Sequence, residues 1–152
     1  MHRRLFIQAG TLASLTSLTL SAPFLIAARA QSASTTGQKR QKIVIQVSDN
    51  DPVKWNLALN NAKNLQDDVG AANVDIEIVV YGPGIGMLKL ESPAGSRIAD
   101  AMTAHVKVIA CENTMRGQKL TRDDMLTAIS YVPAGVTEIM RKQSEGWAYL
   151  RP

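Results

Sequence analysis

The sequence predicts an α/β fold in which helices cover a mainly parallel sheet of about five strands. Short apolar runs alternate with amphipathic stretches from residue 42 to residue 152, a pattern typical of such sheets. A length of 152 residues allows one ordinary domain, and this region shows neither an internal repeat nor a composition break. We therefore expect a single domain over residues 42 to 152.

Five apolar runs are predicted to be the strands. They cover residues 43 to 47, 74 to 80, 106 to 110, 128 to 132 and 147 to 150. In the second run, Asp75 and Glu77 alternate with apolar residues. This alternation predicts that the second strand begins near an edge of the sheet, where one face meets water.

The helix after the first strand has the clearest end signals. Asp51 can cap it, Pro52 suits its first position, and Gly70 can end it. Its apolar face would contain Trp55, Ala58, Leu59, Ala62, Leu65 and Val69.

Further helices are expected over residues 96 to 103, from about 113 to 117, and over 136 to 144, with Ile139, Met140 and Gln143 on one side of the last. Residues 121 to 124 resemble a capping box. The apolar residues Met87, Leu88 and Leu90 fit either the core or a subunit contact.

Residues 1 to 30 are predicted to be a signal peptide. A basic start with Arg3 and Arg4 precedes a Ser/Thr-diluted apolar stretch, and Ala28-Arg29-Ala30 suits cleavage after Ala30. The arginine pair resembles the twin-arginine motif, so we expect a periplasmic protein without stable membrane insertion after cleavage. An uncleaved anchor is the alternative. Residues 31 to 41 would form a flexible linker.

The charge of the chain excludes a nucleic-acid partner. The net charge of +4 falls to +1 without the three arginines of residues 1 to 30, and no large basic cluster remains. One cysteine cannot form an intramolecular disulfide, and two histidines cannot supply a multi-histidine cluster. We therefore expect neither a metal nor a cofactor.

Chemistry is expected at the carboxyl ends of the strands, where ligands collect in parallel sheets. Cys111 is the one intrinsic nucleophile there, and amides at a following helix start would favour its thiolate. Arg116 would favour the Cys111 thiolate while Glu112 would disfavour it, so the direction of the shift in the pKa of Cys111 stays open. A buried, structural Cys111 is the alternative. The candidate binding residues are Ser48, Asp49, Asn50, Tyr81, Gly82, Gly84, Asn113, Thr114 and Arg116.

The glycines at 82, 84 and 86 favour a tight turn over a dinucleotide site, because Met87 occupies a position where the dinucleotide spacing requires glycine. The other segment at a strand end is Pro133-Ala134-Gly135.

Several short motifs in a fixed order resemble the DsrE/DsrF-like family. They are Ser48-Asp49-Asn50-Asp51-Pro52, Tyr81-Gly82-Pro83-Gly84, Cys111-Glu112-Asn113-Thr114-Met115-Arg116, Val132-Pro133-Ala134-Gly135-Val136 and the ending from Glu145 to Pro152. The resemblance spans residues 42 to 152. It implies an α/β/α sandwich that assembles into homo-oligomers, commonly trimers or hexamers, with Cys111 at the position that carries sulfur as a persulfide in relay members. Those members are cytoplasmic, so an exported relative needs a different sulfur donor and acceptor.

Three functional hypotheses follow. We favour a periplasmic sulfur-handling protein, a carrier or sulfurtransferase, in which Cys111 accepts sulfane sulfur from a protein or small sulfur compound and passes it on, while Asn113 and Thr114 hold the anionic sulfur. The alternative is a non-catalytic oligomeric binding or scaffold module with a structural cysteine and a pocket between residues 48 to 50 and 81 to 86. A third hypothesis is a redox sensor that dimerises through one disulfide.

Overall fold

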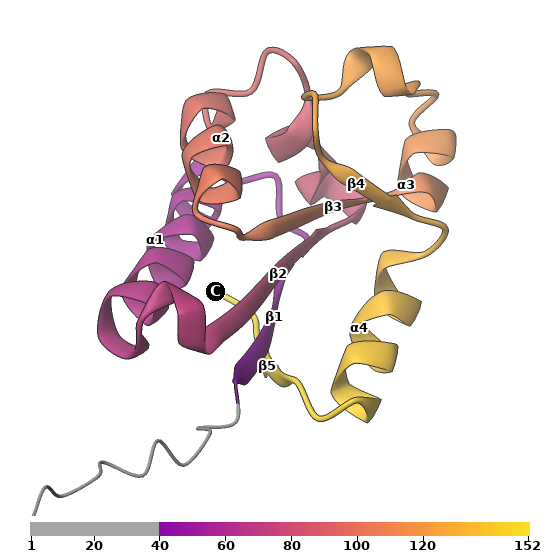
Figure 1. Ribbon diagram of the computed structural model, residues 1–152. Helices are drawn as coiled ribbons and strands as arrows, with labels where there is room; N and C mark the ends of the chain where they lie inside the picture. The colour runs from indigo at the N-terminus through magenta and orange to yellow at the C-terminus, as the bar shows by residue number, and fades with distance from the viewer. Residues whose placement is uncertain (1–39) are drawn as a thin grey trace, which may run out of the picture. The chain divides into compact units, whose positions relative to one another are not determined.

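The structure is a computed structural model that describes residues 40 to 152. Five strands form one sheet in the order β4-β3-β2-β1-β5, with every neighbouring pair parallel (Figure 1). The strands are β1 (Gln41–Val47), β2 (Val74–Val80), β3 (Lys107–Cys111), β4 (Ser130–Val132) and β5 (Ala148–Leu150). The helices are α1 (Pro52–Val69), α2 (Gly95–Thr103), α3 (Glu112–Gly117) and α4 (Gly135–Ser144), with short 3₁₀ helices η1 (Ala71–Asn73), η2 (Gly82–Leu88) and η3 (Arg122–Asp124). The predicted α/β fold is confirmed.

The two faces of the sheet are covered by different helices. Because successive strand residues point to opposite faces, Ile78 of β2 packs with the residues of α1 and α2, whereas Val79 packs with Ile139 of α4. Figure 1 shows α1 and α2 on one side of the sheet and α4 on the other. The sheet is therefore the middle layer of the expected α/β/α sandwich.

Helix α1 begins and ends as its sequence predicts. The Asp51 carboxylate accepts a hydrogen bond of 2.8 Å from the amide of Val53, and Pro52 is the first helical residue. At the other end Gly70 has a φ of +87°, and its amide donates to the carbonyl of Gln66. The buried residues of this helix are Trp55, Ala58, Leu59 and Ala62. The predicted apolar face is confirmed.

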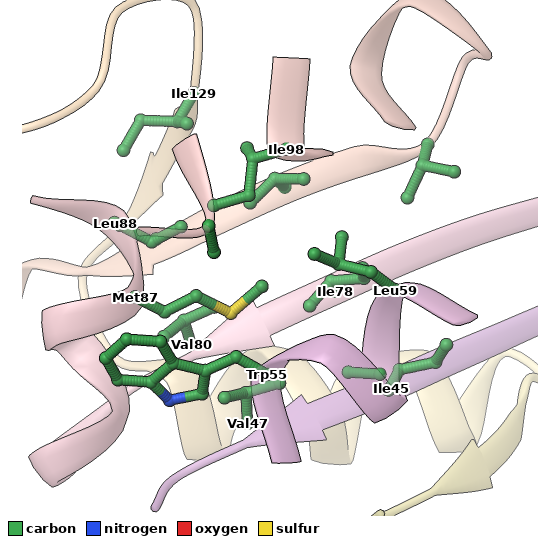
Figure 2. Packing of buried hydrophobic residues seen from close by; sticks show 14 of the residues in the cluster. Ile45, Val47, Trp55, Leu59, Ile78, Val80, Met87, Leu88, Ile98 and Ile129 are labelled. Carbon is green, nitrogen blue, oxygen red and sulfur yellow. The ribbon is translucent and has the colours of Figure 1, made fainter. Parts of the chain in front are cut away.

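The main core lies between the sheet and helices α1 and α2. Figure 2 shows Trp55 of α1 gathered there with Met87, Leu88 and Ile78. Met87 and Leu88 are fully buried, whereas Leu90 is 57% exposed. Met87 and Leu88 therefore belong to the core, whereas Leu90 lies at the surface.

Strand β2 lies between β1 and β3 at the centre of the sheet, so the predicted edge is confined to the start of the strand. Its first three residues pair with β1 alone, since β3 begins opposite Glu77. Glu77 is nevertheless only 1% exposed. Lys142 of α4 covers it with an ammonium group, which makes a carboxylate possible inside the sheet layer.

Several element boundaries differ from the expected ones. Strand β1 begins at Gln41, inside the segment expected to be linker, and Arg40 pairs with Asp75 at 2.7 Å. Strand β4 begins at Ser130 because Ala128 has a φ of +67°, which is not an extended conformation.

The capping box from Thr121 to Asp124 is confirmed, since the Asp124 carboxylate accepts from the Thr121 amide and hydroxyl. The predicted signal peptide, its cleavage site and most of the predicted linker lie outside the described residues. Within residues 40 to 152, no helix is both long and apolar enough to span a membrane.

Candidate functional site

Cys111 is the last residue of β3 and directly precedes α3. All strands are parallel, so the segments that follow β1, β2, β3 and β4 begin at the same edge of the sheet. Cys111 shares the strand face of Ile109, which is the face covered by α4. The residue is 5% exposed, so its thiol lies just beneath the molecular surface.

The start of α4 packs tightly against this cysteine. A Cβ atom built on Gly135 would lie 3.3 Å from Cβ of Cys111 and 3.2 Å from Cβ of Tyr81. These contacts are closer than ordinary van der Waals distances, so a side chain at position 135 would push the helix start or its neighbours apart. Gly135 therefore allows the backbone of α4 to approach Cys111.

The surroundings of Cys111 favour its thiolate. Burial by itself raises the pKa of the thiol, but the Thr114 hydroxyl and the backbone amides of Gly135, Thr114 and Asn113 stabilise the anion, and the resulting pKa is below the ordinary value. Two of these amides belong to the start of α3 and one to the start of α4, so both helix starts lie next to the thiol. The sequence left the direction of the pKa shift of Cys111 open, and the structure indicates a lowered pKa.

Hydrogen bonds join three loops around the cysteine. Thr114 accepts a hydrogen bond of 2.9 Å at Oγ1 from the amide of Gly82, which links α3 to the segment after β2. The amide of Asn113 donates to the carbonyl of Pro133 at 3.1 Å, which links α3 to the segment after β4, and this amide makes the smallest of the named contributions to the thiolate. Asn113, Thr114 and Gly82, all predicted from the sequence, are therefore brought together with Cys111.

Arg116 and Glu112 have partners other than the thiol. The Arg116 guanidinium donates to Oδ1 of Asn113, and Glu112 pairs with Arg122 at 2.9 Å. Neither group is among the main causes of the lowered pKa of Cys111, which are the nearby amides and the Thr114 hydroxyl. Arg116 stands at the rim of the site, where it orients the Asn113 side chain.

The segment from Ser48 to Asn50 lies apart from the cysteine. Strand β2 separates β1 from β3, so the carboxyl ends of β1 and β3 are about 10 Å apart. Asp49 is paired with Lys54 at 3.1 Å and with Arg151 at 3.4 Å. The hydrogen bond from Lys54 is the main reason that the pKa of Asp49 is lowered. These contacts hold the end of the chain against the first loop and do not reach Cys111.

The glycine-rich turn is structural, as predicted. Gly82 has a φ of +56°, and a Cβ on Gly84 would lie 2.8 Å from the carbonyl oxygen of Val47. Tyr81, just before the turn, has a raised pKa because its side chain is partly buried. Glycine thus lets η2 cross the end of β1 at close range.

A groove of about 330 Å³, lined without charged side chains, was missed from the sequence. Its lining residues are Gln46, Tyr81, Val136, Ile139, Met140, Gln143 and Tyr149. Tyr149 donates a hydrogen bond of 2.6 Å to Oε1 of Gln46, although the two lie 103 positions apart in sequence. The only local signal was a polar Gln46 within an apolar strand. Tyr81 contacts Gly135 on one side and the groove on the other, so the groove is next to the thiol site.

The helix residues expected to share a side, Ile139, Met140 and Gln143, do line this one groove, but only Ile139 is buried. Among residues 40 to 152, no group of three or more His, Cys, Asp or Glu side chains is arranged to hold a metal ion.

The fold and the site define a small parallel α/β protein with one thiol of lowered pKa at the carboxyl edge of its sheet. A model of the DsrE/DsrF-like family matches residues 41–152, and the chain belongs to this family. No curated protein matches the chain.

Solved structures share the fold. A protein of unknown function, MTH1491 from Methanobacterium thermoautotrophicum, is 33% identical with a TM-score of 0.70, and the match covers 74% of this chain and 99% of that one. The conserved protein of unknown function BT1422 from Bacteroides thetaiotaomicron is 12% identical with a TM-score of 0.61, covering 74% and 95%. The ychN protein from E. coli is 16% identical with a TM-score of 0.59, covering 74% and 99%. At these identities the last two show the fold alone.

Proposed function

We propose that this protein handles sulfane sulfur, with Cys111 as the residue that accepts a sulfur atom and passes it on. The observation that carries the proposal is the thiol itself: it is the only cysteine of the chain, and two helix starts and the Thr114 hydroxyl stabilise its thiolate. A thiolate is the nucleophile in sulfur exchange, so a lowered pKa increases the reactive fraction at neutral pH.

The transfer consists of two exchange steps. The Cys111 thiolate attacks the terminal sulfur of a donor persulfide, a new sulfur–sulfur bond forms on Cys111, and the donor leaves as a thiolate with the electron pair of the broken bond. An acceptor thiolate then attacks the terminal sulfur on Cys111 in the same way. Each step exchanges one thiolate for another, so neither an oxidant nor a reductant is consumed.

The same groups that stabilise the thiolate suit a bound persulfide. A persulfide anion carries its charge one atom further out, toward the Thr114 hydroxyl and the amides that surround the cysteine. Thr114 is itself held by the Gly82 amide, so the turn after β2 fixes the direction of the hydroxyl. Asn113 and Thr114 would therefore orient the transferred sulfur.

Export and assembly belong to the same proposal. The signal-like residues 1 to 30 support a periplasmic location, reached by the twin-arginine route, where the donor and acceptor would be a protein or a small sulfur compound. On α4, Val136 and Met140 are each 62% exposed beside the groove, which supports a contact between copies in a trimer or hexamer.

A second candidate is a binding module in which Cys111 is structural. Its support is the 5% exposure of Cys111 together with the neighbouring uncharged groove, which would take a neutral ligand. In that case the thiol would not react in the folded protein.

Native mass spectrometry with and without inorganic polysulfide distinguishes the two candidates. We expect one additional sulfur atom per chain, removed by dithiothreitol and lacking in Cys111→Ser. A wild-type thiol that gains no sulfur when folded, yet is alkylated after unfolding in guanidinium chloride, would contradict sulfur transfer and favour the binding module. Non-reducing electrophoresis of the same samples tests the redox sensor, which requires a disulfide-linked dimer.

A further inference from the structure

Helix α4 packs on the sheet with few buried apolar side chains. Its buried positions are Gly135, Glu138, Ile139 and Lys142, so Ile139 is its one buried apolar side chain. The sheet offers Val44, Val79 and Ile109 against it. Since two of the four buried positions are charged, packing of apolar groups alone does not specify where this helix lies.

The charged positions meet a carboxylate of the central strand. Nζ of Lys142 lies 2.9 Å from Oε2 of Glu77 and 3.7 Å from Oε1 of Glu138. The Lys142 ammonium also lies 4.1 Å from the ring centre of Trp147. Nζ of Lys107, on the neighbouring strand β3, lies 3.5 Å from Oε2 of Glu77.

The side chains of Glu77 and Lys142 are only 1% and 10% exposed, so few water molecules can replace either partner. Burial raises the pKa of Glu77, and the neighbouring Lys142 ammonium is the largest effect that opposes this rise. Among residues 40 to 152, neither Oε1 nor Oε2 of Glu77 has a hydrogen-bond partner of good geometry, so Lys142 and Lys107 act on Glu77 as ion-pair partners. A buried pair of this kind adds little net stability, but an arrangement that separates the partners leaves an unpaired buried charge and is therefore costly.

We propose that the buried Glu77–Lys142 ion pair is a positioning device that seats α4 on the sheet so that the Gly135 amide lies against Cys111. This inference rests on the proposed function of Cys111 as the reactive thiol. Gly135 and Lys142 are seven residues apart, two turns along one face of the same helix, so the pair is about 10 Å from the helix start. A helix of this length moves as a rigid rod, and a shift at Lys142 is transmitted to Gly135.

The direct electrostatic effect of the pair on the thiol is small. Glu77 is opposite Lys107, and Cys111 is four residues further along β3, about 13 Å away. At that distance a positive and a negative charge lying side by side largely cancel, and salt screens what remains. An effect of the pair on Cys111 must therefore act through the position of α4.

Three variants test this inference: Lys142→Met, Glu77→Gln and the double variant, all close in shape to the original side chains. The measurement is the ionisation of Cys111, followed by alkylation rate and thiolate absorbance against pH, with Cys111→Ser as the blank. Unfolding in urea establishes that each variant is folded. Lys63→Met is the matched control, because Lys63 forms an exposed helical ion pair with Asp67 that is remote from α4.

We expect a two- to fivefold smaller thiolate fraction at neutral pH, about the contribution of one helix start, in Lys142→Met and in the double variant. Glu77→Gln should have a smaller effect, since Lys142 can turn to Glu138. Lys63→Met should match the wild type. If Lys142→Met does not fold, the double variant decides, because it leaves no unpaired buried charge.

If Cys111 ionises in folded Lys142→Met or in the double variant with the same pH dependence as in the wild type, the proposal is overturned. The proposal is also overturned if the thiolate fraction falls in Lys142→Met and returns to the wild-type value in the double variant. That result would mean that the unpaired charge of Glu77 acts on the thiol directly. The measurement follows ionisation and involves no sulfur donor, so this inference can fail while sulfur transfer stands, or hold while sulfur transfer fails.

Discussion

The two faces of the sheet are built on different principles. On the face covered by α1 and α2, fully buried apolar side chains such as Ile45, Ile78 and Met87 form a continuous core. On the face covered by α4, the buried apolar cluster contains Val44, Val79, Ile109 and Ile139 alone, and it shares that space with Glu77, Lys142 and Cys111.

The same strands serve both faces because their side chains alternate. In β2 the apolar Ile78 follows the charged Glu77, and in β3 the core residue Ala110 precedes Cys111. A thick apolar core on one side stabilises strands whose other side carries the buried charges of Glu77 and Lys142 and the thiol of Cys111. The contrast teaches that one face supplies stability while the other is free to hold chemistry, and three predictions test it.

The largest expected effect is on the core face. Ile78→Ala should lower the free energy of unfolding by about 4 kcal/mol, since it removes a fully buried side chain from the interior of the larger core. Ile139→Ala should cost about 2 kcal/mol, because the groove beside Ile139 lets its surroundings adjust. Urea denaturation measures both values. Equal costs, or a greater cost at Ile139, would contradict the division between the faces.

An intermediate effect is expected at Thr114. Thr114→Val keeps the shape but removes the hydroxyl, so the Gly82 amide loses its acceptor and the Cys111 thiolate loses a donor. We expect a loss of about 1 kcal/mol in unfolding free energy and a higher pKa of Cys111, measured by urea denaturation and alkylation rate against pH.

Thr121→Val is the matched control, since the Thr121 hydroxyl donates to Asp124 at the surface. It should leave the ionisation of Cys111 unchanged. An unchanged thiol in Thr114→Val would show that the backbone amides alone stabilise the anion.

The smallest effect is a pH dependence of stability. The pKa of Cys111 in the folded protein is below the ordinary value of 9.0, so the unfolded chain holds the thiol proton over the interval between the two. Stability from this group is therefore fully present above pH 9.0 and is lost as the pH falls through the folded pKa. Melting temperatures of the wild type minus those of Cys111→Ser should rise with pH across this interval. A flat or falling difference would contradict an activated thiol.

The sequence predicted most elements because their signals are local. Asp51, Pro52 and Gly70 set the ends of α1 through contacts within a few residues, and β-branched runs marked β1, β2 and β3. It also placed Cys111 at a strand end before a helix, and it selected Thr114, Asn113 and Gly82, which gather there.

Predictions failed where a residue depends on a distant partner. Glu77 suggested a solvated strand edge, because the local pattern cannot show that Lys142 will cover it. The groove was missed since Gln46 and Tyr149 meet only when β5 pairs with β1.

The sequence by itself determined the helices, most strands and the position of Cys111 at a strand end, because capping, alternation and turn chemistry act between near neighbours. Only the tertiary structure decided that the pKa of Cys111 is lowered, that the Glu77 carboxylate is buried, and which loops lie next to the thiol. The physical reason is that the order β4-β3-β2-β1-β5 brings the start of α4 onto β3, and strand order depends on packing among all the layers together.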